Sequence, residues 1–381
     1  MQTGAISPAY ARNAKPYLLG GELDAVAAVF EDGEFGHAKI VEQFERAVAA
    51  FLGVDDVVAV ASGTEALYIA LRAAGISPGC EVIVPSLTFC ASVQAIVATG
   101  ARPVFVEVDP ATLCTCAQTL LDAVTSATRA VMPVLYGGRA IDCSSIRAIL
   151  HERDIVIIED AAHAFGSTTP DGEVPVGATG DVTCFSFGPI KNLTCGQGGA
   201  IVPRSAHEAE RARTLRLWGV ATSQAERKRT TGYQVQGTGL HGFMSAINAA
   251  IGLVQLDGFA ALRERRTSLW RAYRDVLAPL EQVALVDVDI ERSVPFNCVV
   301  RVPERDAVFT AMRGAGLGVG VHYPPNHRQP AFDAWARGLP VTEKVSEQIM
   351  SLPFHPAMDA DDAQIVAAAL AQALPSARGR G

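Results

Sequence analysis

The sequence predicts an α/β protein with a seven-stranded, mainly parallel sheet between helices and a smaller C-terminal α/β domain. Two observations support this fold class: seven short apolar runs alternate with helical patterns between residues 57 and 203, and shorter strand and helix patterns mix after residue 283. Such alternation gives a parallel sheet covered by helices and joined by right-handed crossovers. A chain of 381 residues, 49% of them hydrophobic, is long enough for one large or two medium domains.

The seven apolar runs are continuous rather than alternating, which is typical of strands buried on both faces of a sheet. Helical patterns separate them, as in the segment after the first run, where Leu67, Leu71 and Ala74 recur on one face. The predicted strands are 57–61, 81–85, 102–108, 129–135, 154–160, 182–187 and 199–203.

The rest of the chain changes character after residue 204. Long helical patterns, charged on one side, follow to about residue 280, and the second of them is expected to carry the chain out of the large domain. Strand patterns at 297–302 and 318–324 then alternate with helical ones. We expect three parts: an N-terminal segment at 1–35 packed near the small domain, a large domain at 36–255, and a small domain at 256–381.

Composition excludes several classes of function. The chain carries 40 acidic and 32 basic side chains, a net charge of −8, whereas nucleic-acid binding requires a dominant basic face. No stretch reaches the roughly 18 apolar residues of a membrane span, and the first residues lack the apolar run of a secretory signal. The eight cysteines form no CxxC pair. We therefore expect a cytoplasmic protein with no membrane, nucleic-acid or metal partner.

Three polar motifs follow predicted strands. Residues 62–64, Ser-Gly-Thr, open a helix whose free N–H groups suit a phosphate, although an ordinary helix cap is the commoner role of such residues. Asp160 ends a buried strand, where open parallel sheets bind ligands, but a carboxylate there can equally cap the next segment. Lys191 stands four residues beyond a predicted strand and before a glycine-rich return; in isolation it would be an ordinary turn lysine.

Together these motifs point to one chemistry. An aldehyde cofactor with a phosphate and a pyridine ring needs an amine, phosphate donors, and an acid that keeps the ring nitrogen protonated. Lys191, residues 62–64 with Ser186, and Asp160 supply these groups in turn. Their order along the chain fits strand ends that face one crevice.

Five successive motifs resemble the signatures of the DegT/DnrJ family of sugar aminotransferases, which are pyridoxal 5'-phosphate (PLP) enzymes of fold type I. The resemblance runs from about residue 36 to residue 356, nearly the whole chain. The motifs are SGTEAL at 62–67, PSLTFCASVQAI at 85–96, EDAAHAFGS at 159–167, CFSFGPIKNLTCGQGGAIV at 184–202 and GVHYPPNHRQPAF at 320–332.

The resemblance implies a role for each matching position. Lys191 matches the lysine that binds the cofactor aldehyde and later shuttles a proton, and Asp160 matches the carboxylate paired with the ring nitrogen. His163 matches a residue close to the ring hydroxyl, and Phe89 the aromatic that stacks on the ring face. The positions that match phosphate ligands are Gly63, Thr64 and Ser186.

The sequence departs from the family at two places. Where members usually carry Asn-Tyr-Arg, with the Asn reaching the phosphate of a neighbouring subunit, this chain has His241, Gly242 and Phe243. His241 can still donate to phosphate, and the resemblance implies a homodimer with shared active sites. Gln197 replaces an acidic residue that is common in the glycine-rich loop. These departures predict an outlying subgroup with an unusual acceptor.

The loop at 322–329 resembles the family loop that lines the substrate entrance. The residues expected to contact the substrate are His322, Tyr323, Asn326 and His327, although a purely structural loop is equally consistent with the sequence. Two histidines without a third ligand do not make a metal site. Three arginines are candidates for contacts to a nucleotide diphosphate: Arg216, Arg301 and Arg328.

The predicted function is PLP-dependent transfer of an amino group from an amino acid, L-glutamate or L-glutamine, to a keto sugar. The sugar is expected to be nucleotide-linked and destined for a secondary metabolite or a surface glycan. Two alternatives stay open: amination of a keto-cyclitol or other free ketone, and a PLP-binding regulatory protein without turnover. Sugar dehydration is disfavoured because enzymes of that type usually replace the lysine with histidine, whereas Lys191 is present.

Overall fold

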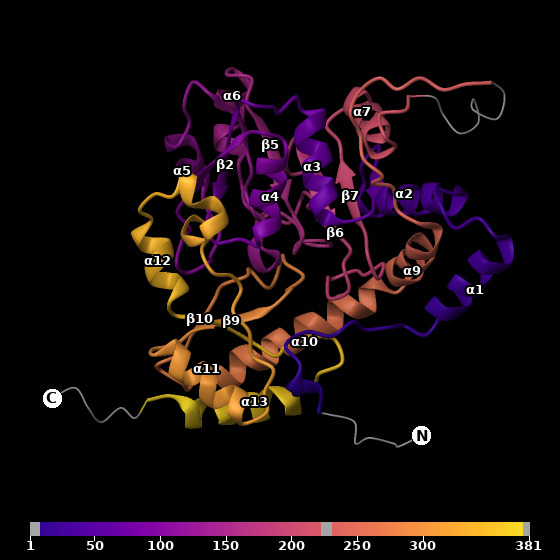
Figure 1. Cartoon of the computed structure of the whole chain (residues 1–381). Helices are drawn as coiled ribbons and strands as arrows, with labels where there is room; N and C mark the ends of the chain where they lie inside the picture. Colours follow the sequence, from indigo (N-terminus) through magenta and orange to yellow (C-terminus); the bar gives the residue numbers. More distant parts are fainter. Residues whose placement is uncertain (1–7, 222–230, 376–381) are drawn as a thin grey trace.

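Seven strands form one sheet in the order β1-β7-β6-β5-β4-β2-β3 in the computed structural model of the chain, which describes residues 8–221 and 231–375 (Figure 1). All seven lie within the runs predicted from the sequence or one residue outside them, so the predicted fold class is confirmed. The strands are β1 (Val58–Val60), β2 (Glu81–Pro85), β3 (Arg102–Val106), β4 (Thr128–Val131), β5 (Val156–Asp160), β6 (Val182–Ser186) and β7 (Gly199–Val202).

Six of these strands run in the same direction. Strands β3, β2, β4, β5 and β6 pair in parallel, whereas β7 is antiparallel to both β6 and β1, which makes β1 parallel to β6. The carboxyl ends of these six strands therefore meet at one edge of the sheet, which is where open α/β sheets bind ligands.

Helices cover both faces of the large sheet (Figure 1). Along β2, Val82 and Val84 join one apolar cluster with α3, α4 and α7, whereas Ile83 joins the cluster on the other face with α2, α5, α6 and α9. This burial on both faces explains why the strands are continuously apolar. The helices are α2 (Lys39–Leu52), α3 (Gly63–Ala73), α4 (Cys90–Ala98), α5 (Ala117–Asp122), α6 (Ser144–His151), α7 (Ala206–Arg216) and α9 (Ala246–Asp257).

The long helical stretch predicted near residue 250 is two helices. Gly258 separates α9 from α10 (Phe259–Leu277), and a Cβ atom on Gly258 would lie 2.4 Å from Leu19 Cδ1. In Figure 1, α10 runs from α9 toward a second, smaller body. That body contains an antiparallel sheet in the order β10-β9-β8 and an apolar cluster of its own. Its elements are β8 (Ala284–Leu285), β9 (Cys298–Arg301), α11 (Arg305–Gly314), β10 (Ile349–Leu352) and α13 (Ala360–Ala373). Between α11 and β10 the chain forms α12 (Pro340–Ser346).

The prediction of a strand at 318–324 is wrong. Only Gly320 pairs there, in a single bridge to Ser351. The N-terminal segment occupies the adjacent space: a Cβ on Gly318 would lie 2.4 Å from the backbone of Arg12, and the Asn13 side chain donates to the carbonyl of Ser351 at 3.1 Å.

The N-terminal segment also contains α1 (Glu22–Asp32), which packs on α9. Residues 1–7 lie outside the described residues. The division of the chain at residues 35 and 255 stays a proposal.

Within 8–221 and 231–375, no helix is long and apolar enough to cross a membrane, and no group of three His, Cys, Asp or Glu side chains is arranged to hold a metal ion.

Candidate active site

A cavity of about 160 Å³ lies at the carboxyl edge of the large sheet. Its walls come from the turn after β1, the loop between β2 and α4, the ends of β5 and β6, and the loop that leads into β7. Seven of the eight residues predicted to bind the cofactor line this cavity: Gly63, Thr64, Phe89, Asp160, His163, Ser186 and Lys191.

The turn after β1 forms a phosphate-sized cradle. Ser62 caps α3 by accepting a hydrogen bond from the Glu65 N–H at 3.2 Å, so the N–H groups of Gly63 and Thr64 begin the helix without an acceptor inside it. A Cβ on Gly63 would lie 2.6 Å from Ser186 Cβ. Glycine is therefore required for the helix start to approach the Ser186 hydroxyl. Free N–H groups, the positive end of a helix and a hydroxyl fit a phosphate.

Asp160 is the buried carboxylate of the cavity. Its Oδ2 accepts from Ser92 Oγ at 2.6 Å and its Oδ1 from the Ala162 N–H at 3.1 Å, which fixes the side chain. Burial raises the pKa of Asp160, while these hydrogen bonds and the positive charge of Lys191 lower it. A protonated ring nitrogen placed here would favour the ionised carboxylate in the same way.

Lys191 is half-buried in the loop after β6. Its Nζ lies 4.6 Å from the centre of the Phe296 ring. Burial lowers the pKa of Lys191 to about 8; Arg266 contributes in the same direction, and the negative charge of Asp160 opposes the shift. A substantial share of the amine is therefore neutral near physiological pH, as a nucleophile and proton acceptor requires.

His163 is a neutral hydrogen-bond donor. The N–H of Gly137 donates to Nδ1 at 3.4 Å, which assigns the ring proton to Nε2, 3.1 Å from the Tyr323 hydroxyl. Burial, followed by the charge of Lys191, holds the pKa of His163 well below its usual value. The ring also stacks on Phe296, with the centroids 3.9 Å apart.

His241 is the one predicted cofactor ligand that does not line the cavity of its own chain. The side chain is exposed and stacks on Trp218 at 4.6 Å, with Phe243 against its edge. The carbonyl of Gly242 accepts from the N–H of Ala61 at 2.9 Å, so this segment runs beside the turn after β1.

Two of the four predicted residues of the loop at 322–329 lie near the cavity without lining it. Tyr323 contacts His163 and lies 5.6 Å from the Phe89 ring. His322 is fixed by Ser351 Oγ at 2.7 Å from its Nδ1, and its carbonyl accepts from the Tyr136 hydroxyl. Burial and the nearby Lys191 lower the pKa of His322 to about 4.

The other two predicted residues of this loop are buried in packing contacts and do not line the cavity. Asn326 donates to the carbonyls of Ser86 and Thr88 at 3.0 and 2.7 Å. His327 lies between Ser86 Oγ, 2.7 Å from Nδ1, and Glu343, 3.1 Å from Nε2. Both side chains anchor the loop that carries Phe89 instead of facing the cavity.

Sequence reasoning missed several residues around Lys191. Ser92 lies in the second motif, three residues after Phe89, so helical spacing was a usable signal. Phe296, Tyr136 and Arg266 carried no such signal, because they come from segments with no polar motif.

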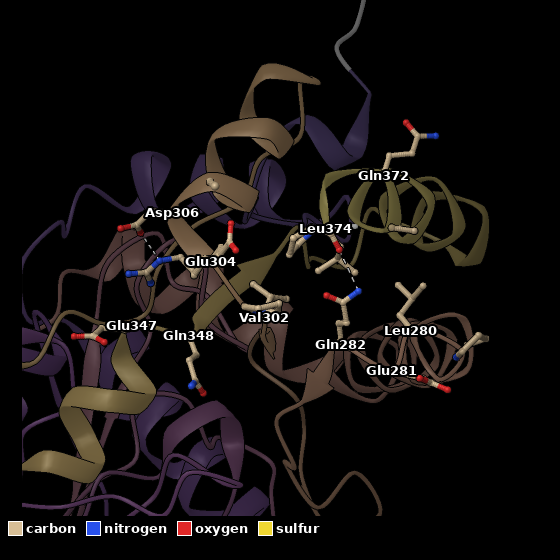
Figure 2. Close-up of a pocket in the computed structure, with 16 residues that line it drawn as sticks. Leu280, Glu281, Gln282, Val302, Glu304, Asp306, Glu347, Gln348, Gln372 and Leu374 are labelled. Carbon is tan, nitrogen blue, oxygen red and sulfur yellow. Dashed lines mark hydrogen bonds and ion pairs between the residues drawn. The ribbon is translucent and has the colours of Figure 1, made fainter. Parts of the chain in front are cut away.

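A larger hollow of about 1680 Å³ lies on the small body, between the end of α10, the start of α11 and the end of α13 (Figure 2). Glu281, Glu304 and Asp306 line it, and Gln282 donates to the Pro375 carbonyl at 3.3 Å across one side. None of the predicted site residues lines this hollow. The smaller cavity at the sheet edge is therefore the candidate active site.

The fold defines a class of protein: it is the fold of the type I PLP enzymes. The chain belongs to the DegT/DnrJ/EryC1/StrS aminotransferase family, whose model matches residues 18–371. It is thus a PLP-dependent aminotransferase from a family of sugar aminotransferases.

Named relatives agree with this assignment. The chain is 33% identical over 362 residues to the spore coat polysaccharide biosynthesis protein SpsC of Bacillus subtilis (strain 168), covering 91% of this chain and 92% of SpsC. The aminotransferase TlmJ from Streptoalloteichus hindustanus superposes with a TM-score of 0.88 at 31% identity, covering 95% and 98% of the two chains. DesV from S. venezuelae gives 0.86 at 33% identity, covering 94% and 98%.

Proposed function

We propose that this enzyme moves an amino group from L-glutamate or L-glutamine to a nucleotide-linked keto sugar, in the cytoplasm, to make an amino sugar for a surface glycan or a secondary metabolite. The observation that carries the proposal is the meeting of Lys191, Asp160 and Ser186 at one cavity in a sugar aminotransferase fold. The name of SpsC, a polysaccharide biosynthesis protein, supports a sugar acceptor.

The roles of the residues follow from their chemistry. PLP, when bound, supplies an electron sink for the charge that develops on the donor carbon. With PLP bound, Lys191 Nζ would hold the cofactor aldehyde and, once displaced by the donor, would accept the proton of the donor carbon and deliver it to the former aldehyde carbon of the cofactor. Asp160 holds the ring nitrogen, and Ser186 with the helix start at residues 63–64 holds the phosphate. Phe89, 56% exposed at the cavity, covers the ring face.

The test is a mass-spectrometric screen of donors and acceptors. Purified protein loaded with PLP is incubated with each amino acid, and nucleotide-linked keto sugars are compared with free keto-cyclitols. We expect an aminated nucleotide sugar when L-glutamate or L-glutamine is supplied. Amination of free ketones alone would overturn the nucleotide-sugar acceptor, and no amination with either donor would overturn the donor assignment.

The alternative acceptor is a keto-cyclitol or other free ketone. The positions of the three arginines that were candidates for diphosphate contacts favour it. Arg216 is buried and donates to the Ala59 carbonyl and to Glu45. Arg328 pairs with Glu343 at 2.6 Å. Arg301 lies on β9 in the small sheet. Among the residues that the structure describes, these three cations are therefore not assembled for a diphosphate.

We further propose a homodimer in which His241 of one subunit reaches the phosphate held by the other. Large apolar side chains are exposed on α1 and at Trp218, which follows α7 and stacks on His241: Leu23 is 79% exposed, Phe30 60% and Trp218 47%. In Figure 1, α1 stands at the outer edge of the molecule. Exposed apolar surface of this kind is typical of subunit interfaces. An active monomer in sedimentation analysis would exclude the shared site.

A further inference from the structure

Arg266 is a buried cation that no carboxylate pairs with in the described part of the chain. Its side chain is 3% exposed on α10 and donates only to backbone carbonyls. One terminal nitrogen bonds Pro295 and Phe296, at 3.4 and 3.2 Å, and the other bonds Ile190 and Lys191, both at 3.4 Å. A buried charge without a counter-charge is costly. Its position against the lysine loop therefore needs a functional explanation.

Arg266 bonds carbonyls on both sides of the contact between the Lys191 amine and the Phe296 ring. One pair lies in the loop that carries Lys191, and the other lies at Phe296, whose ring is 4.6 Å from the Lys191 amine. The same ring stacks on His163. The guanidinium thus fixes both the lysine and the aromatic surface on which its amine rests.

We propose that Arg266 and Phe296 are a pair of positioning residues that orient the Lys191 amine and balance its charge. The guanidinium repels the ammonium form, whereas the electron-rich face of the ring attracts it. The inference rests on the proposed role of Lys191 as the residue that binds PLP.

Other groups also face the amine, and they set the direction of each effect. Asp160 attracts the ammonium, whereas His163 and His322 are neutral near pH 7 because burial lowers their pKa values. Asp160 raises the pKa of Lys191 and Arg266 lowers it, so removing the charge of Arg266 should raise this pKa above about 8. Removing the ring of Phe296 should lower it. The two substitutions therefore have opposite signs.

The experiment measures the capture of PLP by the full-length chain freed of cofactor. Only the neutral amine attacks the aldehyde, so the rate at which the visible absorption band grows follows the titration of Lys191. We expect Arg266→Met to move the midpoint of this pH profile upward and Phe296→Leu to move it downward, each by about half to one pH unit. Phe296→Tyr, which keeps the ring, should restore the original midpoint.

Arg265→Met is the matched control. Arg265 is the exposed neighbour of Arg266 on α10 and contacts the Tyr17 ring at 4.9 Å instead of the lysine loop. Its midpoint should equal that of the original chain. Shifts of the same sign in Arg266→Met and Phe296→Leu, or no shift in either, would overturn the inference. If Arg266→Met does not fold, Phe296→Leu serves as the test by itself, and an unchanged midpoint in that variant would overturn the inference.

The same measurement separates this inference from the proposed function. If the unsubstituted chain develops no visible band with PLP at any pH, the role of Lys191 itself fails. If the band forms but the two midpoints do not move apart, only the role of Arg266 and Phe296 fails.

Discussion

Two neighbouring carboxylates at the end of β5 have different roles because a strand points successive side chains to opposite faces. Asp160 faces the cavity, whereas Glu159 accepts from the hydroxyls of Thr179 and Thr183 at 2.6 and 2.7 Å. Burial raises the pKa of both. A one-residue change of register would exchange the two roles, so the chemistry depends on the strand as much as on the carboxylate.

At the same scale, Lys191→Ala should abolish both the visible absorption band with PLP and transamination. The variant loses the amine that we propose binds the cofactor and moves the proton, and proton transfer alone contributes roughly 10²- to 10⁴-fold in rate. Absorbance and a glutamate-dependent assay check this result. Lys344→Ala, which removes an exposed lysine of α12, is the control and should behave like the original chain. Full activity in Lys191→Ala would exclude the proposed site.

Ser92→Ala should change the pH dependence of activity. The hydrogen bond from Ser92 lowers the pKa of Asp160, so its loss raises that pKa, and the ionised carboxylate is lost at a higher pH on acidification. We expect the acidic limb of the kcat profile to move upward by about one pH unit. Ser92→Thr keeps a hydroxyl and should retain the original limb. If the acidic limb of the kcat profile does not move in Ser92→Ala, the ionisation of Asp160 does not control the rate.

At the scale of elements, strands were predictable and loop contacts were not. Continuous apolar runs identified all seven strands of the large sheet, because burial on both faces favours apolar side chains along most of each strand. The motif order also brought Gly63, Asp160 and Lys191 to one edge. The strand expected at 318–324 failed because Asn13, distant in sequence, occupies the neighbouring space. Contacts between distant segments leave no local pattern.

The start of α3 allows a test of the phosphate cradle. Gly63→Ala would place a Cβ 2.6 Å from Ser186 Cβ and force the helix start away from the hydroxyl. Loss of one charge-assisted hydrogen bond should weaken PLP binding about 10- to 100-fold, as measured by equilibrium absorbance titration. At Gly314, in α11, a Cβ meets no atom within 4 Å, so Gly314→Ala should bind PLP normally. Equal affinities in both variants would place the phosphate elsewhere.

The loop between β2 and α4 should lose stability when its anchor is removed. Asn326→Ala leaves the buried carbonyls of Ser86 and Thr88 without their side-chain donor, at a cost of about 1–3 kcal/mol. Urea unfolding measures this change in the free energy of unfolding. The KM for the acceptor should stay near its original value in the folded variant, and a large rise in KM would restore Asn326 as a substrate ligand.

For the whole molecule, the sequence anticipated a second, smaller body and a loop of it, at 322–329, beside the site, but it did not anticipate the contacts of Phe296 and Arg266. The residues that line the cavity all come from segments before residue 198, whereas Tyr323, Phe296 and Arg266, from the last third of the chain, contact lining residues from behind. Apolar periodicity reports burial and gives no information on which distant segments meet.

The proposed dimer belongs to this scale. Phe30→Asp places a charge on the exposed face of α1 and should shift the sedimentation profile toward monomer, with weaker PLP binding because His241 of the partner is lost. Val341→Asp, at another exposed apolar position on α12, is a matched control and should leave the profile unchanged. An unaltered dimer in Phe30→Asp would move the interface away from α1.

The bonds from Arg266 to the carbonyls of residues 190 and 191 also have a consequence for biosynthesis of the protein. The ribosome completes the sheet and Lys191 before α10 emerges, and Phe296 follows later still. A nascent chain therefore has its reactive lysine before it has the groups that hold that lysine in place. Chains that end before about residue 300 are therefore expected to lack Phe296 or its surroundings, and with them the groups proposed to position Lys191.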